Sequence, residues 1–123
     1  MFSWLKNGLS RPHPLENWSV EIAEDHITTS DGQGEVHQLP LADLEEVVIA
    51  TDDSGPWGAD VVYLLYSMEK EPVGLFPIEA QGTQEFVEWL SQRDGYNDQQ
   101  LRNAMRSTQI ARFLIYQRPT SRG

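Results

Sequence analysis

Three apolar stretches between residues 41 and 82 constrain the fold more than any other part of the sequence. Residues 46–51 are rich in β-branched side chains, residues 61–66 are almost entirely apolar, and residues 73–78 follow a polar turn. Short apolar runs bounded by turn residues are typical of β-strands, and an almost wholly apolar run indicates a central strand. This segment therefore predicts an antiparallel sheet.

The residues before this segment predict further strands. Residues 18–22 alternate between apolar and polar side chains, which is the pattern of a half-buried strand. Residues 26–29 and 35–39 continue the pattern, and the Asp31-Gly32 pair between them favours the positive φ angles of a tight turn. We therefore expect a meander of three strands ahead of residue 41.

After residue 82 the hydrophobic period becomes helical. Residues 86–90 place apolar side chains at i, i+3 and i+4, with Thr83 predicted as the N-cap and Gly95 as the C-terminal cap. A second short helix is predicted to begin at Asn97, and the apolar run 113–116 predicts a last strand.

We therefore expect an α+β protein: an antiparallel sheet or partly open barrel of about six to seven strands, with two short C-terminal helices and a final strand. A chain of 123 residues corresponds to one domain. The expected divisions are an N-terminal arm at 1–16, a single domain at 17–118 and a flexible tail at 119–123. Apolar residues of the arm are available to dock back onto the domain: Phe2, Trp4 and Leu5.

The net charge of −10 is concentrated in the middle of the chain. Residues 1–20 carry a balance of +1, residues 21–79 a balance of −13, and residues 80–123 a balance of +2. Phosphate groups are bound through Lys and Arg, so neither nucleic acid nor an anionic membrane is an expected partner. The acidity is either a solubilising surface or a surface that attracts a basic protein, and the arginines near the C-terminus are expected to balance it.

The absence of cysteine excludes disulfide scaffolds, thiol catalysis and cysteine-ligated zinc. No stretch approaches the roughly 20 apolar residues that span a bilayer, and the first residues lack the apolar run of a secretory signal. We expect a cytoplasmic protein that is a monomer or a weak homodimer and requires no cofactor.

The densest group of polar and aromatic residues surrounds the turn at residues 55–58, Gly-Pro-Trp-Gly. Carboxylates in this region are candidates for a hard cation, although their spacing is not that of a calcium loop and Asp is common in turns. The tryptophan either packs on the sheet or is an exposed anchor for a partner. The residues predicted to bind a partner are Asp52, Asp53, Pro56, Trp57 and Asp60.

No catalytic residue and no metal ligand is predicted. His13, His26 and His37 lack the spacing of a metal site, although His26 and His37 are able to meet on neighbouring strands. Ser54 lacks the G-x-S-x-G context of a nucleophile elbow, and no phosphate-binding glycine loop is present.

Several short motifs follow one another in a characteristic order. A Thr-x-x-x-Gly-Pro segment at 51–56 precedes Asp-Val-x-aromatic at 60–63, Pro-x-x-Ala-x-Gly at 77–82 and Ala-Met-x-Ser-Thr at 104–108. In this order, over about residues 44–118, they resemble the pattern of an uncharacterised family of small bacterial proteins. The resemblance implies no activity, because no activity is established for the family.

Residues 18–49 are similar to the opening strands of bacterial pleckstrin-homology-like domains. Some domains of that kind bind phosphoinositides through basic residues, which are absent here. The corresponding hairpin carries Glu24, Asp25 and His26, so lipid headgroups are not expected ligands.

These observations favour a non-enzymatic protein-binding domain that uses an acidic surface and the Trp57 loop. Its partner is an unknown protein, and a basic one if the acidic surface takes part. One form of this hypothesis is an immunity or antitoxin-type inhibitor of a basic toxin. The alternative is a small hydrolase or a metal-binding protein, with a carboxylate and histidine site around Asp52, Asp53 and Asp60.

Overall fold

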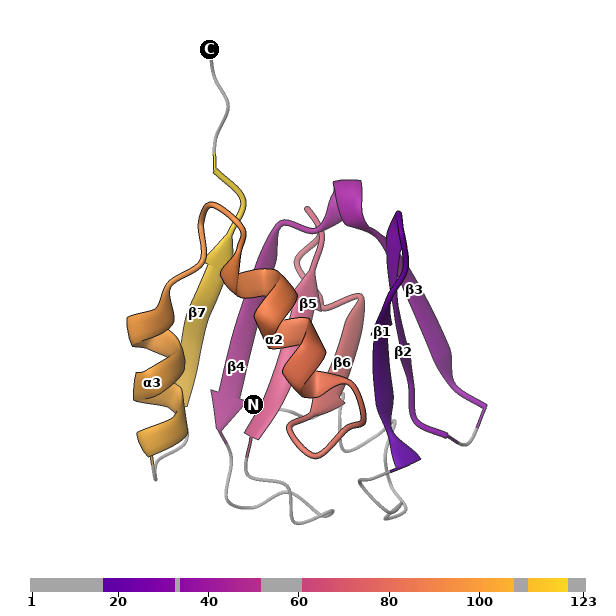
Figure 1. The fold of residues 1–123 in the computed structure, drawn as a ribbon, viewed down its shortest axis with the longest axis horizontal. Helices are drawn as coiled ribbons and strands as arrows, with labels where there is room; N and C mark the ends of the chain where they lie inside the picture. The colour runs from indigo at the N-terminus through magenta and orange to yellow at the C-terminus, as the bar shows by residue number, and fades with distance from the viewer. Residues whose placement is uncertain (1–16, 33, 52–60, 108–110, 120–123) are drawn as a thin grey trace.

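The computed structural model describes residues 17–32, 34–51, 61–107 and 111–119. Over these residues the chain forms seven strands and two α-helices (Figure 1). The strands are β1 (Ser19–Ile22), β2 (His26–Ser30), β3 (Val36–Pro40), β4 (Glu46–Thr51), β5 (Val61–Tyr66), β6 (Gly74–Pro77) and β7 (Ala111–Gln117). The helices are α2 (Thr83–Ser91) and α3 (Asp98–Arg106), and a 3₁₀ turn, η2 (Leu41–Asp43), joins β3 to β4.

The strands form two antiparallel sheets. The three-stranded sheet has the order β1-β2-β3, and the four-stranded sheet has the order β6-β5-β4-β7. The expected α+β class, with two helices before a final strand, is confirmed. The strands are divided between two sheets, however, and among the described residues no strand ladder joins them into a closed barrel. The division occurs at Pro40, which has no N–H group to continue a ladder, and η2 then redirects the chain.

The alternation of the first strands places their apolar side chains in the core. Val20 pairs with Thr29, and Ile22 pairs with Ile27 on the neighbouring strand. Side chains on one face of a sheet recur every second residue, so these residues and Leu39 share the inner face, turned toward the four-stranded sheet.

The core lies between the two sheets and α2. Tyr63 and Phe76 are paired on β5 and β6, and their rings stack with centroids 5.0 Å apart. Phe86 of α2 meets the ring of Phe76 edge to face at 5.3 Å, so these two strand residues mark the inner face of the four-stranded sheet. Burial raises the pKa of Tyr63 well above its ordinary value, so its hydroxyl stays protonated.

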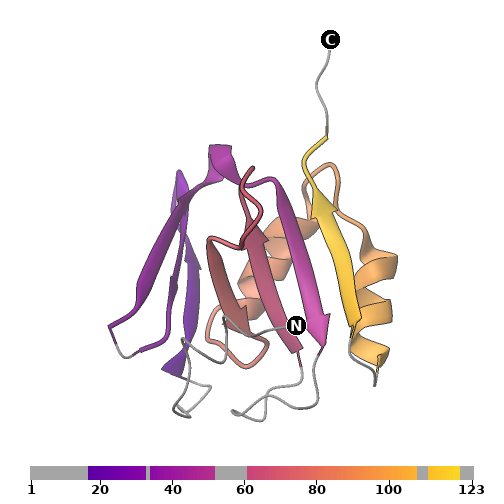
Figure 2. The same ribbon diagram turned by 180° about the vertical axis from the view of Figure 1, so that it is seen from behind.

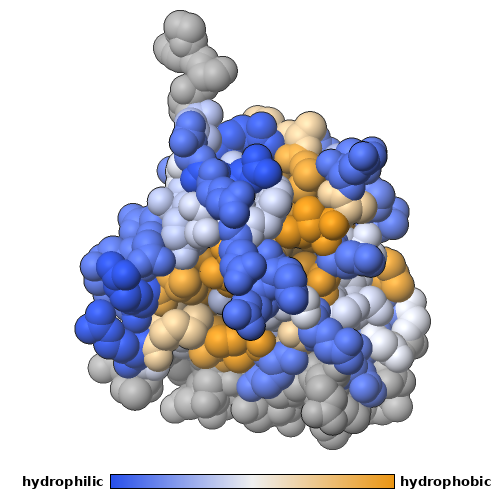
Figure 3. Space-filling view, in the orientation of Figure 1, coloured by the Kyte–Doolittle hydropathy of each residue, from blue (hydrophilic) through white to orange (hydrophobic). Residues whose placement is uncertain are grey.

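Both helices lie on this inner face, which is the near side in Figure 1 and the far side in Figure 2. α2 crosses the sheet, and α3 packs against β7 and β4. Hydrophilic side chains cover the outward sides of both helices, as expected for amphipathic helices with one face in the core (Figure 3).

The helix caps agree only in part with the sequence prediction. Asn97 caps α3 as predicted, because its side-chain oxygen accepts a hydrogen bond of 3.1 Å from the Gln100 N–H. Thr83 is not the N-cap of α2. That position is Gly82, and the Thr83 hydroxyl donates instead to the Ala80 carbonyl at 2.9 Å. Gly95 is not a helix cap either, because α2 ends at Ser91.

A buried hydroxyl in the core gives a stability prediction. Thr29 is 2% exposed, and its hydroxyl has no hydrogen-bond partner among the described residues. A buried unpaired hydroxyl costs about 1–3 kcal/mol of desolvation, so we expect Thr29→Val to raise the free energy of unfolding by about 1 kcal/mol. Urea denaturation measures the change. Thr28→Val on the opposite face is the control, expected to change stability by less than ~0.5 kcal/mol. A less stable Thr29→Val protein would contradict the prediction.

Candidate functional site

The five residues predicted to bind a partner lie outside the described residues: Asp52, Asp53, Pro56, Trp57 and Asp60. The structure describes only where this loop leaves and rejoins the fold. Thr51 and Val61 pair at the end of the β4–β5 hairpin, and the Thr51 hydroxyl oxygen accepts a hydrogen bond of 3.0 Å from the Ala111 N–H. The candidate loop is thus connected to one end of the four-stranded sheet.

The described histidines do not converge. His26 pairs with Pro40, whereas His37 pairs with Thr29 three residues further along β2. An odd number of residues separates the two positions, so they lie on opposite faces of the sheet. Each histidine has an acidic neighbour of its own: His26 Nδ1 lies 2.7 Å from Asp25 Oδ1, and His37 Nε2 lies 3.8 Å from Glu35 Oε2. The structure therefore does not bring these imidazoles into a shared site.

Among the described residues, most arginines contact groups other than the carboxylates of the acidic middle of the chain. Arg93 lies over the Trp89 ring at 4.4 Å, Arg102 pairs with Asp98 inside α3, and Arg112 donates to the Tyr66 hydroxyl. Arg118 is the exception, with its Nε 3.2 Å from Glu45 Oε2.

Several segments that carry acidic residues meet at one end of the molecule, the upper end in Figure 1. The β1–β2 turn, η2, the start of β4 and the β5–β6 turn all meet there. We call this region the acidic end and define it by six carboxylates: Glu24, Asp25, Asp43, Glu46, Glu69 and Glu71. None of these six forms an ion pair with a Lys or Arg among the described residues.

Backbone hydrogen bonds hold the acidic end together. The Leu41 N–H donates to the Asp25 carbonyl at 2.8 Å, which fixes the β1–β2 turn against η2. The Glu45 N–H donates to the Tyr66 carbonyl at 2.8 Å, which fixes the start of β4 beside the end of β5. The Arg118 guanidinium also donates to three carbonyl groups of the η2 region. Arg118 therefore stabilises this turn in addition to pairing with Glu45. These carbonyls belong to Leu41, Ala42 and Leu44.

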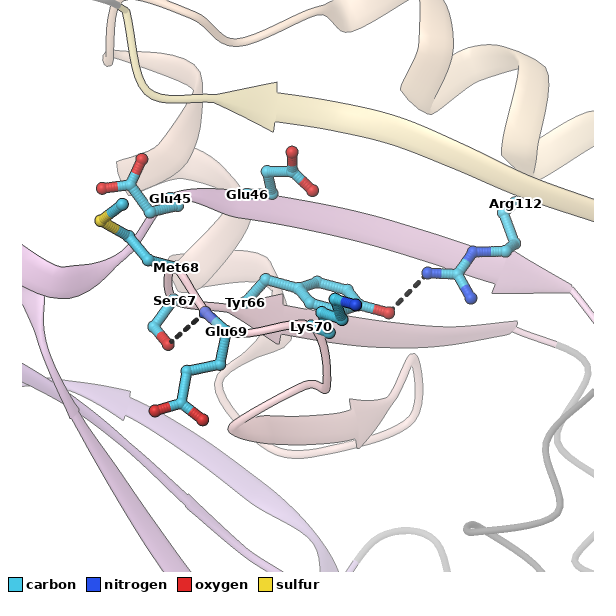
Figure 4. Close-up of a pocket in the computed structure, with 8 residues that line it drawn as sticks. All are labelled: Glu45, Glu46, Tyr66, Ser67, Met68, Glu69, Lys70 and Arg112. Atoms are coloured by element: carbon cyan, nitrogen blue, oxygen red, sulfur yellow. Dashed lines mark hydrogen bonds between the residues drawn. The ribbon is translucent and has the colours of Figure 1, made fainter.

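An open depression of about 470 Å³ adjoins the acidic end (Figure 4). Its lining combines carboxylates, two cationic side chains and apolar surface: Glu45, Glu46, Tyr66, Ser67, Met68, Glu69, Lys70 and Arg112. Tyr66 and Arg112 point toward each other across the sheet, and the guanidinium carbon lies 5.8 Å from the ring centroid. Met68, in contrast, is 87% exposed. A large apolar side chain is therefore presented to solvent among negative charges.

The sequence prediction missed this depression because it treated Met68 and its neighbours only as a turn. The available signal was a methionine directly before three charged residues in a turn, where no packing requirement explains it. The contact between Tyr66 and Arg112 had no local signal, because the two residues are 46 positions apart in sequence.

The described residues contain no group of three or more His, Asp or Glu side chains arranged to hold a metal ion. A second open depression of about 470 Å³ lies between the end of α2 and β7, lined by side chains of both charges: Gln92, Arg93, Asp94, Tyr116, Arg118 and Pro119. Arg93 and Arg118 already have the partners described above, which leaves the first depression as the better candidate for binding.

The chain matches no protein-family model, no curated protein and no solved structure. Its function is therefore inferred from its own geometry. In the part of the chain that the structure describes, no helix is both long and apolar enough to cross a membrane.

Proposed function

We propose that this protein is a non-enzymatic binding domain whose acidic end takes a basic segment of another protein. The supporting observation is that the exposed Met68 lies beside carboxylates that have no Lys or Arg partner among the described residues. Methionine is flexible and polarisable, so it adapts to varied apolar surfaces. The carboxylates select positive charge, and Met68 supplies contact area.

Electrostatics favours this assignment over an anionic ligand. Exposed like charges create a field that accelerates the approach of an oppositely charged protein, and this acceleration falls with salt. Lys70 and Arg112 border the depression but stand beside three carboxylates, and Arg112 already donates to Tyr66. A phosphorylated ligand would therefore meet net repulsion at this site.

The proposal includes the inhibitor hypothesis as a special case, in which the basic partner is a toxin. The Trp57 loop is a separate candidate contact. Its flanking residues, Thr51 and Val61, lie at the opposite end of the β4–β5 hairpin from Glu46 and Tyr66. One partner would have to be longer than a strand of six residues, about 20 Å, to reach both regions. The hydrolase or metal alternative at Asp52, Asp53 and Asp60 lacks support from the described histidines, which do not converge.

The likeness to pleckstrin-homology-like domains belongs to this proposal too, at the level of the opening strands. The antiparallel succession of β1, β2 and β3 supports it, whereas β4 belongs to the other sheet. Glu24 and Asp25 are exposed at the first hairpin, which argues against phosphoinositides and in favour of a protein ligand.

Affinity capture with charge-neutralised variants tests the proposal. The acidic-end variant combines Glu46→Gln, Glu69→Gln and Glu71→Gln. We expect it to lose a partner that the unaltered chain captures at low salt, because removing these charges lowers association rates roughly tenfold. After the partner is identified by mass spectrometry and purified, surface-based kinetics measures the rate change. Met68→Ser is expected to raise the dissociation rate instead, because it removes contact area.

A control variant carries the same change of net charge elsewhere. It combines Glu79→Gln, Glu85→Gln and Glu88→Gln, which replace carboxylates away from the acidic end. This variant is expected to capture the partner almost as well as the unaltered chain. If both variants captured less partner to the same extent, net charge alone would explain the binding. If the acidic-end variant still captured the partner, the assigned surface would be refuted.

A further inference from the structure

The two sheets have four edge strands, β1, β3, β6 and β7, and three of these edges are paired or buried at least in part. On the outer edge of β1, the Val20 N–H donates to the Gln81 carbonyl at 2.8 Å. On the outer edge of β7, the Asn97 N–H donates to the Ile115 carbonyl at 2.8 Å. β6 is mostly buried and ends in Pro77, which has no N–H group to offer another strand.

The edge of β3 is different because it is exposed. All residues of this strand except Leu39 are exposed, and Val36 is 54% exposed. β3 lies at the outer border of the molecule in both views of the fold (Figures 1 and 2). Among the described residues, no strand pairs with β3 on the side away from β2.

The ladder with β2 determines which main-chain groups of β3 face outward. The Asp31 N–H donates to the Glu35 carbonyl at 3.1 Å, so the main chain at Glu35 faces β2. In an antiparallel pair, the main-chain groups of successive residues point alternately toward the partner strand and away from it. Val36 and Gln38 therefore direct their N–H and C=O groups away from β2, toward the open edge.

Charge indicates which kind of strand this edge accepts. Exposed edges are commonly protected by Lys side chains, but no Lys or Arg occurs between residues 12 and 69. Carboxylates flank β3 instead. Glu35 directly precedes the strand, and its side chain is 70% exposed. Asp43 follows the strand on η2 and belongs to the acidic end. An added strand with positive side chains would meet attraction at both ends of β3.

We propose that β3 binds an extended basic segment of another protein as an additional strand, through the main-chain groups of Val36 and Gln38. This inference rests on the proposed function and specifies how the basic segment is held. Because η2 directly follows β3, a segment on this edge continues toward the acidic end. Main-chain hydrogen bonds supply affinity for many sequences, and the carboxylates select positive charge.

A second copy of this chain is the other possible strand for an exposed edge. Pairing of two β3 strands would bring together chains that each carry a net charge of −10. Like charges across an interface oppose association, so charge favours the basic segment. Sedimentation at low salt is expected to show that the edge does not pair with itself. A dimer in which the Val36 and Gln38 amides are protected from exchange would overturn the proposal.

Amide hydrogen exchange measured by NMR tests the added strand, with a synthetic peptide of alternating Lys and Val residues as the probe. In the free chain, we expect the Val36 and Gln38 amides to exchange faster than the Leu39 amide, which faces β2. Saturating peptide should slow exchange at Val36 and Gln38 by about tenfold or more, because both N–H groups become hydrogen-bonded. A fully N-methylated peptide of the same charge cannot complete the ladder and should give no protection.

The same titration separates this inference from the proposed function. If the peptide shifts the resonances of Met68 and Glu69 without protecting Val36 and Gln38, the added strand is refuted and binding at the acidic end remains supported. If the peptide affects neither region, both are refuted. A peptide with Glu in place of Lys is expected to give no protection, and equal protection by this peptide would refute the selection of basic segments.

Two pairs of variants give an independent readout. Gln38→Pro removes an outward N–H but no hydrogen bond to β2, so we expect it to weaken peptide binding about tenfold. Gln38→Ala keeps that N–H and should bind almost normally. Slow exchange of the Leu39 amide shows that β3 stays paired with β2 in each variant. Val36→Lys keeps every main-chain group and should weaken binding through repulsion, whereas Val36→Thr should not. Unchanged binding by folded Gln38→Pro or Val36→Lys would contradict the proposal.

Discussion

Gly82→Ala is expected to destabilise the protein by roughly 3–5 kcal/mol, because the added carbon has no space. A Cβ at Gly82 would lie 2.1 Å from the Val20 carbonyl oxygen, and the φ angle of 91° is one that other residues rarely adopt. The Val20 N–H also donates to the Gln81 carbonyl at 2.8 Å, so the clash falls on the junction between β1 and the start of α2. Thermal and urea denaturation would measure the loss.

Gly34→Ala is a matched control for this prediction. Gly34 also has a positive φ, 111°, but no described atom lies within 4 Å of the point that its Cβ would occupy. We expect a cost of only about 1–2 kcal/mol, due to the backbone conformation alone. Equal costs at the two glycines would show that close approach to Val20 is not what requires glycine at position 82.

Phe86→Ala is expected to cost about 3–5 kcal/mol, the range typical of emptying a buried aromatic site. Phe86 is 1% exposed, and its ring contacts those of Tyr63, Phe76 and Trp89 at centroid distances of 6.2, 5.3 and 6.0 Å. The change removes the centre of this aromatic cluster and leaves a cavity between α2 and the sheet.

Two variants check the cause of this loss. Glu88→Ala, on the exposed side of the same helix, should change stability by less than about 0.5 kcal/mol. Phe86→Leu should recover a large part of the lost stability, because it refills most of the cavity. If Phe86→Ala cost no more than Glu88→Ala in urea denaturation, α2 would not be held to the sheet by this ring.

The strands and helices were predictable because their signals are local. Alternation at residues 18–22, the apolar run at 61–66 and the cap at Asn97 each depend on a few neighbouring side chains. The same signals say nothing about how strands are distributed between sheets. That β7 pairs with β4, and that Pro40 separates two sheets, depends on contacts between residues distant in sequence.

Gly82 shows the same limit in a single residue. From the sequence, Thr83 had the side chain expected of an N-cap, and Gly82 had no evident role. The approach of the Val20 carbonyl, from a strand far earlier in the chain, determines which residue can occupy the helix start. The acidic end follows this rule as well. Its net charge could be predicted from composition, but its location depends on separate turns that meet only in the folded protein.

The pairing of β7 with β4 also affects how the chain is synthesised. Ile49 and its partner Phe113 are 64 positions apart (113 minus 49), so the two strands emerge from the ribosome at different times. At an elongation rate of about 5–20 residues per second, β4 waits several seconds for its neighbour. Throughout that interval the edge of β4 that later pairs with β7 has unpaired N–H and C=O groups, which other nascent chains can bind. The sheet is therefore completed only when its last strand has been synthesised. A pause in translation before residue 111 would lengthen the period in which the unpaired edge of β4 can aggregate with other chains.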